Sequence, residues 1–239
     1  MNALLLRLLR LFSRERWGAA FVGGGDFEAV GREFLGLFQR FGLQPDDDVL
    51  DIGCGVGRMA VPLSGFITSG SYVGIDVSAD AIELCRKRVK RENFKFVHAD
   101  LYNSLYNKSG QRAADYRFPF PDRSFDFIVL CSVFTHMLRD EVEHYLAEMA
   151  RVMRDDATCF ITWFVIDGPL PSPSITFHPL DGVSFIRKRR VPAAAVAYKG
   201  DYVMDLYARY GLRPSLHVGT WARPSGLIFQ DVVVARKGQ

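Results

Sequence analysis

Residues 49–58 read VLDIGCGVGR, and this stretch indicates the architecture of the whole chain. The apolar residues at its start are typical of a short buried strand, and three alternate glycines follow at Gly53, Gly55 and Gly57. Because they lack Cβ atoms, these glycines let the backbone turn tightly and approach a ligand. A helix is predicted at 57–66, and its first N–H groups and positive dipole end are expected to face that ligand.

The spacing of the glycines argues against two common phosphate-binding motifs. The dinucleotide motif G-x-G-x-x-G requires a third glycine at the position that Arg58 occupies in this chain. A phosphate loop of the form GxxxxGK[ST] is absent as well. We therefore expect a nucleotide-like cofactor that is recognised through a different glycine pattern.

Three further segments place polar or reactive residues at the ends of predicted strands. The strand at 71–76 ends in Asp76, the strand at 94–98 leads into Asp100, and a fourth strand ends at Cys131. Ligands of α/β sheets bind outside the carboxyl ends of the strands. A carboxylate in that place accepts strong hydrogen bonds from hydroxyl groups. These residues are therefore expected to surround the same ligand as the glycine turn.

In this order and spacing, the segments resemble the motifs of class I S-adenosylmethionine (AdoMet)-dependent methyltransferases over about residues 45–166. The resemblance implies that AdoMet is the cofactor, with its ribose at Asp76, its adenine at Asp100 and its methionine end near Cys131. The residues assigned to cofactor binding in this way are Asp51, Gly53, Cys54, Gly55, Gly57, Arg58, Asp76, Val77, Asp100, Leu101 and Cys131. The alternative for each acid is a structural role, as a helix cap or a turn residue.

The pattern of the whole chain predicts one large α/β domain. It has 239 residues, of which 49% are hydrophobic, enough for a sizeable core. Strands are predicted at 48–52, 71–76, 94–98, 125–131, 158–166, 213–220 and 227–236, and helices at 3–14, 26–42, 57–66, 79–91, 139–153 and 200–210. We expect a Rossmann-like, seven-stranded, mostly parallel sheet with helices on both faces and a C-terminal antiparallel hairpin.

Several local features accompany this pattern. Asp26 and Ser78 are predicted N-caps, 154–157 is predicted to be a turn, and a short turn at 223–226 is predicted to join the last two strands. The resemblance divides the chain into an N-terminal helical cap, residues 1–44, and a catalytic domain, residues 45–239.

The N-terminal segment is amphipathic, with three arginines on one predicted helical face, Arg7, Arg10 and Arg14. It is too short and too charged to span a bilayer, and it lacks a clean signal-peptide cleavage pattern. Two interpretations are open: a helix packed over the domain or its cleft, and a peripheral helix on a membrane surface. The glycines at 23–25 are interpreted as a linker or as a flexible lid.

Two long loops are expected to recognise the acceptor of the methyl group. One spans residues 102–119, and the other spans residues 167–199 and contains the basic run Arg187–Arg190. That run is interpreted as a solvated surface or as a contact for an anionic acceptor. A net charge of only +3, without interleaved aromatic residues, argues against nucleic acid as a partner. The acceptor is therefore expected to be a small molecule or a lipid- or sugar-linked group.

The four cysteines, at positions 54, 85, 131 and 159, show no metal-binding spacing. They are interpreted as free thiols, which suits a reducing compartment. The sequence therefore predicts a cytoplasmic protein without a bound metal. Peripheral membrane contact through the N-terminal helix is the open alternative to a purely cytoplasmic location.

His136 is the candidate general base, because it follows the fourth strand beside the expected methyl-donor end. Its alternative is a structural histidine that holds the loop, and Asp167 is a weaker candidate for acceptor contact. Two other functions remain open on the same fold. One is a non-catalytic protein that binds AdoMet or S-adenosylhomocysteine. The other is different chemistry such as aminopropyl transfer, against which the neutral residues and histidine at 132–137 count.

Overall fold

The computed structural model describes residues 26–102, 110–168, 170 and 173–238. Its main sheet has seven strands in the order β10-β11-β5-β4-β1-β2-β3. The strands are β1 (Val49–Ile52), β2 (Tyr72–Asp76), β3 (Phe94–His98), β4 (Phe125–Leu130), β5 (Met153–Trp163), β10 (Leu212–His217) and β11 (Asp231–Lys237). β11 pairs antiparallel with both of its neighbours, and the other pairs are parallel. The predicted Rossmann-like sheet with its antiparallel hairpin is therefore confirmed.

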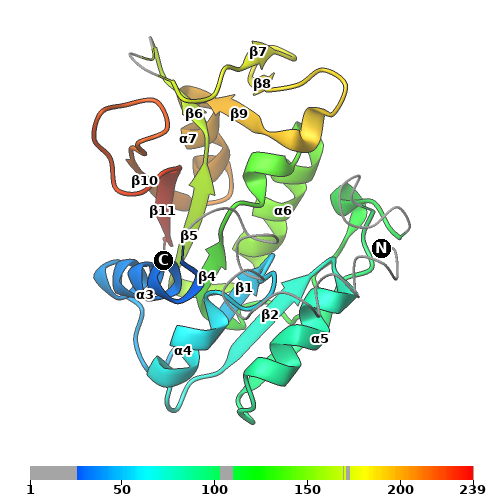
Figure 1. Cartoon of the computed structure of the whole chain (residues 1–239), viewed down its shortest axis with the longest axis vertical. Coiled ribbons are helices and arrows are strands. Elements are labelled where there is room, and N and C mark those ends of the chain that lie inside the picture. The colour runs from blue at the N-terminus through cyan, green and yellow to red at the C-terminus, as the bar shows by residue number, and fades with distance from the viewer. Residues whose placement is uncertain (1–25, 103–109, 169, 171–172, 239) are drawn as a thin grey trace.

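Helices cover both faces of this sheet (Figure 1). The helices α3 (Phe27–Arg40), α4 (Ala60–Phe66) and α5 (Ala79–Arg88) share one apolar core with the sheet, and α6 (Arg139–Val152) and α7 (Gly200–Arg209) share the other. Along β1 to β5, alternate residues enter the two cores, and the central strands β1 and β4 are buried except for Asp126. No helix in the described part of the chain is long and apolar enough to cross a membrane.

α3 packs against the main sheet through its phenylalanine side chains. Asp26 caps it as predicted, because its Oδ1 accepts a hydrogen bond from Ala29 N at 2.6 Å. The rings of Phe34 and Phe38 pack against Phe160 of β5, with centroid distances of 6.1 and 5.1 Å. The predicted helix at 3–14, its arginine face and the glycines at 23–25 lie outside the described residues.

The predicted turn at 154–157 is wrong, because β5 runs through these residues. Asp156 has a φ of 65°, and the pairing of β4 with β5 shifts register here, which marks a bulge in the strand. Arg154 forms ion pairs with Asp48, at 2.8 Å, and with Asp126. Since these carboxylates lie beside the starts of β1 and β4, the ion pairs hold Arg154 in the sheet. The predicted end of this strand at residue 166 is also too late.

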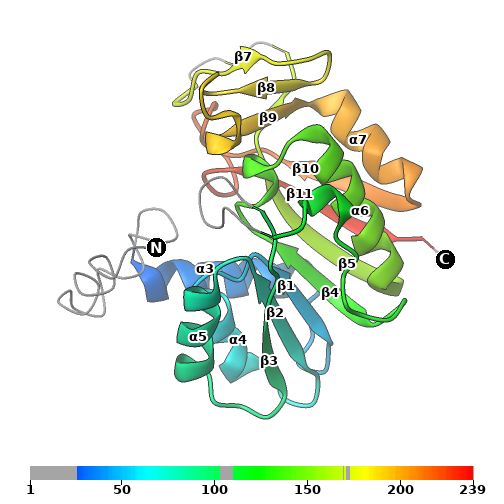
Figure 2. The same ribbon diagram turned by 90° about the vertical axis from the view of Figure 1, so that its right-hand side faces the viewer.

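The segment 167–199, predicted to be a loop, contains most of a second sheet (Figure 2). Its strands are β6 (Val165–Ile166), β7 (His178–Pro179), β8 (Ser184–Ile186) and β9 (Val196–Lys199), in the order β6-β9-β8-β7. With only two to four residues each, the strands leave little periodicity in the sequence. They are held by pairing between distant residues and by a cluster around Phe164 and Trp221.

The connection between β10 and β11 is longer than predicted. It spans residues 218–230, whereas a short turn at 223–226 and a strand from 227 were expected. The apolar residues Leu227 and Ile228 are typical of the start of a strand, but in the structure they lie in the loop and pack against the core shared with α3, α4 and α5. The antiparallel pairing itself is confirmed, with Ser215 opposite Val234.

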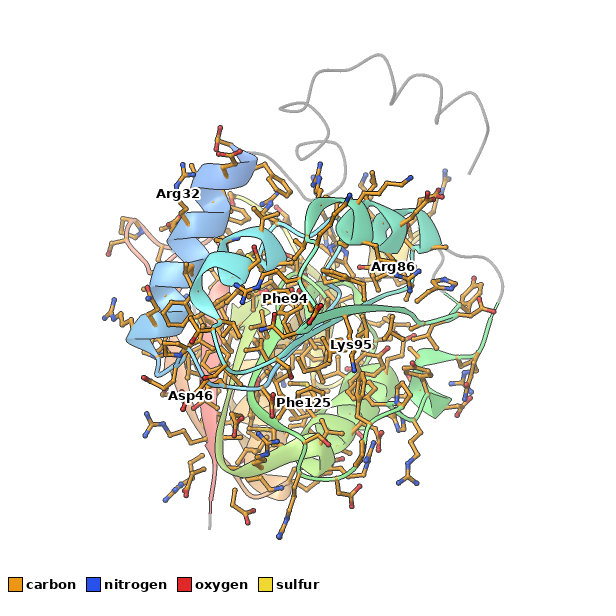
Figure 3. All side chains as sticks on the ribbon, turned by 90° about the horizontal axis from the view of Figure 1, so that it is seen from below. Arg32, Asp46, Arg86, Phe94, Lys95 and Phe125 are labelled. Atoms are coloured by element: carbon orange, nitrogen blue, oxygen red, sulfur yellow. The ribbon has the colours of Figure 1, made fainter. Side chains whose placement is uncertain are left out.

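Figure 3 shows the edge of the main sheet at which the parallel strands begin, opposite to the edge formed by their carboxyl ends. Phe94 and Phe125 begin β3 and β4 there, and Asp46 lies just before β1. Both phenylalanines are buried, and Asp46 is exposed. The predicted cofactor residues lie at the other ends of the strands. Asp46 is therefore a control position for substitutions, remote from those residues.

Candidate functional site

The glycine turn after β1 needs glycine at all three alternate positions. Gly53, Gly55 and Gly57 have φ values of 77°, 53° and 85°, a region that other residues rarely adopt. The N–H groups of Gly53 and Cys54 both donate to the carbonyl of Ile75, at 2.8 and 3.0 Å. These two bonds anchor the turn to the end of β2. A Cβ on Gly53 would clash with the side chain of Val133, which follows β4.

The helix after the turn begins three residues later than predicted. α4 starts at Ala60, because the positive φ of Gly57 extends the turn and interrupts helical geometry. A Cβ on Gly57 would lie 3.1 Å from the Sγ of Cys85, so this glycine allows α5 to pack closely. The third glycine therefore serves the packing of the turn on α5.

Asp76, at the end of β2, joins the glycine turn to the start of α5. Its Oδ2 accepts from Gly55 N and its Oδ1 accepts from Ser78 N, both at 2.8 Å. Burial raises the pKa of the Asp76 carboxyl, while these backbone hydrogen bonds oppose that rise. Ser78 caps α5 as predicted, with its Oγ accepting from Ala81 N at 3.3 Å. The structure thus brings the predicted ribose-binding carboxylate directly beside the turn.

Asp51 is a buried carboxylate next to the turn, with only 1% of its surface exposed. Tyr72 donates a hydrogen bond from its hydroxyl to Asp51 Oδ2 at 2.6 Å. Burial raises the pKa of Asp51 to about 7, although the Tyr72 hydrogen bond acts in the opposite direction. Burial also raises the pKa of Cys131, and the negative charge of Asp51 adds to this effect while Arg58 opposes it. Asp51, Arg58 and Cys131 are therefore electrostatically coupled at the ends of β1 and β4.

The residues after β3 form the outer end of the candidate site. Ala99 N donates to Asp76 O at 2.9 Å, which ties the end of β3 to β2. Asp100 is exposed, and its carbonyl accepts from Gln111 N at 3.0 Å, whereas Leu101 is buried. Part of the predicted acceptor loop that follows, residues 103–109, lies outside the described residues.

The thiol of Cys54 faces the protein core. It lies so close to Gly74 that a Cβ on that glycine would be 2.9 Å from its Sγ. A hydrogen bond with Cys85 and burial both raise the pKa of Cys54 well above its usual value. All four cysteines are free thiols. The Cys54 thiol is therefore packed between Gly74, Cys85 and the carbonyl of Gly55, at 3.9 Å from that oxygen, and serves the packing of the turn.

Ser132, directly after Cys131, is a residue of the site that the sequence did not indicate. It has a φ of 57°, which is strained for a residue with a Cβ. Its N–H donates to Thr162 Oγ1 at 2.7 Å, and its hydroxyl donates to Gln230 Oε1 at 3.0 Å. The end of β4 is therefore tied both to β5 and to the segment before β11.

His136 lies in a short 3₁₀ turn, Phe134–His136, between β4 and α6. Its Nδ1 is 2.9 Å from the carbonyl of Ala193, so Nδ1 carries the proton and donates to that oxygen. In a neutral ring this leaves Nε2 as an acceptor. The weaker candidate, Asp167, lies against Gly200 at the start of α7, because a Cβ on Gly200 would be 3.3 Å from its Cβ.

A metal site is not evident in the described residues, which contain no group of three or more His, Cys, Asp or Glu side chains suited to hold a metal ion. The prediction of a metal-free site stays a prediction. An AdoMet-like group fits the arrangement, because a turn without Cβ atoms lies beside carboxylates at the ends of adjacent parallel strands.

Residues 50–161 match the family described as methyltransferase domain. The matched stretch contains the glycine turn, Asp76, Asp100 and His136, which are the residues described above. Over this stretch, just under half of its length, the chain is similar to class I S-adenosylmethionine-dependent methyltransferases, whose cofactor is AdoMet. The resemblance and the cofactor inferred from the sequence are confirmed at this level.

Relatives of known name resemble the same stretch. The methyltransferase GfsG of Streptomyces halstedii is 33% identical over 136 residues, which are 56% of this chain and 44% of the relative. The fatty-acid O-methyltransferase of Mycolicibacterium smegmatis is 28% identical over 130 residues, which are 53% and 42% of the two chains. The chain thus spans less than half the length of these relatives.

Solved structures support the fold. An S-adenosylmethionine-dependent methyltransferase from Mesorhizobium loti superimposes with a TM-score of 0.61 at 15% identity. The superposition covers 86% of this chain and 98% of that chain. Because its coverage extends beyond the matched family segment, the similarity in fold includes elements outside residues 50–161.

Proposed function

We propose that this chain transfers a methyl group from AdoMet to a small or lipid- or sugar-linked acceptor. The observation that carries the proposal is the joining of the glycine turn to Asp76 through Gly55, beside the buried carboxylate of Asp51. The match of residues 50–161 to the methyltransferase domain supports the choice of donor. The name of the fatty-acid O-methyltransferase among the relatives supports an oxygen atom on an apolar acceptor.

The proposed cofactor contacts follow the edge of the sheet. Asp76 and Val77 would meet the ribose hydroxyls, and Asp100 and Leu101 would meet the adenine. The residues Asp51, Gly53, Cys54, Gly55, Gly57, Arg58 and Cys131 would surround the methionine part. Asp76 accepts backbone hydrogen bonds from Gly55 and Ser78 at 2.8 Å and also from Val77, and a carboxylate has about four acceptor sites, so it can still accept from a hydroxyl donor.

The proposed mechanism asks the protein mainly for orientation. AdoMet supplies a methyl group that its sulfonium already activates for displacement. Residues at the ends of β4 and β5 would orient the acceptor atom toward the methyl donor, and orientation of this kind lowers barriers by roughly 7–11 kcal/mol in favourable systems. For a hydroxyl acceptor, the Nε2 of His136 takes the proton, which adds about 10²–10⁴-fold to the rate.

The proposal extends to the domain division of the chain and to its location. Residues 1–44 are proposed to cap the catalytic domain, residues 45–239, and α3 supports this by packing on β5. Four free cysteines support a cytoplasmic location. Peripheral membrane contact through residues 3–14 is tested by removing residues 1–16 and measuring liposome binding, since unchanged partitioning would exclude that contact.

The proposal is tested first by calorimetric titration of the purified chain with AdoMet and S-adenosylhomocysteine. Asp76→Ala should abolish micromolar binding, whereas Asp46→Ala, on the opposite edge of the sheet, should leave it unchanged. Labelled AdoMet is then incubated with laurate, dodecanol and small polar acceptors. Cofactor binding without transfer to any acceptor favours the non-catalytic alternative, and absence of cofactor binding contradicts the proposal.

A further inference from the structure

Asp231, the first residue of β11, is a fully buried carboxylate that the cofactor site does not use. Its Oδ2 accepts from Val165 N at 2.8 Å and from the indole Nε1 of Trp221 at 2.6 Å. Its Oδ1 accepts from Gly219 N at 2.8 Å and pairs with Arg223 at 3.4 Å. A buried carboxylate is costly unless such donors surround it. Asp231 therefore joins the β5–β6 junction to the segment 218–230.

The segment 218–230 is a compact loop whose two ends are held together. Leu227 N donates to Val218 O, and Thr220 N donates to Ile228 O, both at 2.8 Å. Gly219 lies so close to the backbone of Gln230 that any Cβ would clash. With these bonds and the donors to Asp231, the loop has a defined shape.

Trp221 connects this loop to the second sheet. Its ring packs on Phe164 and Phe177, with centroid distances of 5.2 and 5.6 Å. Its carbonyl accepts from Ser174 N at 2.6 Å and from Ser174 Oγ at 2.8 Å. Asp231 thus holds the residue at which the loop, the second sheet and the main sheet meet.

The outer side of the loop is apolar where it continues toward the cofactor edge. Phe229 is 51% exposed and Val218 is 37% exposed, and both are among the few large exposed hydrophobic residues of the described chain. The neighbour of Phe229, Gln230, accepts from Ser132 Oγ at the end of β4. Phe229 is therefore one residue away from the contact between this loop and the end of β4, where the methionine part of the proposed cofactor would lie.

We propose that the segment 218–230 is a wall that binds the apolar chain of the acceptor, and that Asp231 is the positioning residue that fixes this wall. The inference rests on the proposed methyl transfer and narrows its acceptor to molecules with a hydrocarbon chain. The Phe229 ring packs edge-on against Phe164, with a centroid distance of 6.3 Å, yet about half of its surface stays exposed. A hydrocarbon chain laid along Phe229 and Val218 would remove this apolar surface from water. The carboxyl or hydroxyl end of such an acceptor then lies near Ser132 and the methyl donor.

The test measures binding of laurate and dodecanol to the full chain saturated with S-adenosylhomocysteine, with butyrate as the short-chain comparison. Phe229→Ser and Asp231→Asn should each weaken laurate and dodecanol binding by about tenfold or more. Both variants should keep the wild-type affinity for S-adenosylhomocysteine. Tyr207→Phe is the matched control, because it removes a buried hydrogen bond, to Trp163 Nε1, on the helix side of the sheet.

The outcomes distinguish the proposed apolar wall from the proposed methyl transfer. Because Phe229 also packs on Phe164, the unfolding midpoint of Phe229→Ser is measured beside its laurate affinity, and an unchanged affinity for S-adenosylhomocysteine shows that the variant is folded. If Tyr207→Phe loses laurate as strongly as Asp231→Asn does, the positioning role of Asp231 is overturned. Equal laurate affinity in wild type and Phe229→Ser, or tight S-adenosylhomocysteine binding without laurate or dodecanol binding, overturns the apolar wall. Failure to bind S-adenosylhomocysteine overturns the proposed function instead.

Discussion

We call the ends of β1, β2 and β3 the cofactor side of the molecule, and the segment 218–230 with the second sheet its proposed acceptor side. The two sides are assembled by contacts of different range. On the cofactor side, Gly55 meets Asp76 across 21 positions of sequence, and Asp76 meets Ser78 across two. On the acceptor side, Val165 meets Asp231 across 66 positions and Ser132 meets Gln230 across 98. The first side is made of consecutive strand–turn–helix units, and the second exists only when distant segments meet. Local motifs therefore indicate the donor of the proposed reaction, while long-range packing builds the region proposed to bind its acceptor.

The largest effect is expected at the centre of the cofactor side. Gly53→Ala forces a Cβ into Val133 at a φ of 77°, which should destabilise the fold by about 2–5 kcal/mol and abolish AdoMet binding. Urea unfolding and calorimetry check both expectations. Gly65→Ala in α4, where no atom lies within 4 Å of the added Cβ, should be neutral or mildly stabilising. Normal cofactor binding by Gly53→Ala would contradict the importance of the turn.

His136 tests whether the two sides cooperate in the reaction. His136→Ala should lower turnover of a hydroxyl acceptor by about 10²–10⁴-fold without changing AdoMet affinity. His144→Ala is the matched control, because His144 also bonds a backbone carbonyl, that of Tyr116 at 2.8 Å. Rates are measured over a range of pH values, and full turnover of His136→Ala at every pH would leave this histidine with a structural role.

Asp51 gives the stability of the cofactor side a pH dependence. Its folded-state pKa of about 7 lies above its usual value near 3.8, so the folded protein holds this proton more tightly than the unfolded chain. The unfolding free energy should therefore fall as the pH rises from about 4 to 7, by at most roughly 4 kcal/mol.

Asp51→Asn checks this expectation by removing the titrating group while keeping an oxygen that can accept from Tyr72. Urea unfolding at pH 5 and at pH 8 should show a smaller difference for the variant than for the wild type. An identical pH dependence in both proteins would mean that other groups cause it. Tyr72→Phe should raise the pKa of Asp51 further, because it removes the hydrogen bond that favours the carboxylate.

The smallest effect is expected where the two sides meet, at Ser132. Ser132→Ala keeps the strained φ of 57° and loses the hydrogen bond to Gln230, so it should cost about 1 kcal/mol. Ser132→Gly loses the same bond but relieves the strain, and should be at least as stable as Ser132→Ala. Thermal unfolding of the two variants measures the difference. A less stable Ser132→Gly would show that the backbone at this position is not strained.

Local sequence patterns predict the cofactor side well. The glycines at alternate positions, the acid that ends β2 and the N-cap Ser78 each signal their structure within a few residues, and the structure has all three. The boundaries are less exact, because a positive φ at Gly57 delays α4 in a way that the apolar pattern does not show.

The second sheet and the compact segment 218–230 could not be predicted, since they are held by distant pairs. β7 and β9 are too short for periodicity, and Asp231 falls inside the predicted strand 227–236 as an ordinary polar residue. Its donors, Val165 N and Trp221 Nε1, come from segments that only the fold brings beside it. The bulge at Asp156 was predicted as a turn because its polar residues resemble one. Ion pairs from Arg154 to two other strand starts override that local preference.

The strand order of the main sheet also constrains how the chain folds. β10 has a single strand neighbour, β11, which itself pairs with β5 much earlier in the chain. β10 can therefore join the sheet only after β11 has closed the long loop back to β5, and closing such loops is slow. In a refolding experiment, the units from β1 to β4 can pair first, and the hairpin follows in a later kinetic phase. The protein would acquire its donor site before the place for its acceptor exists.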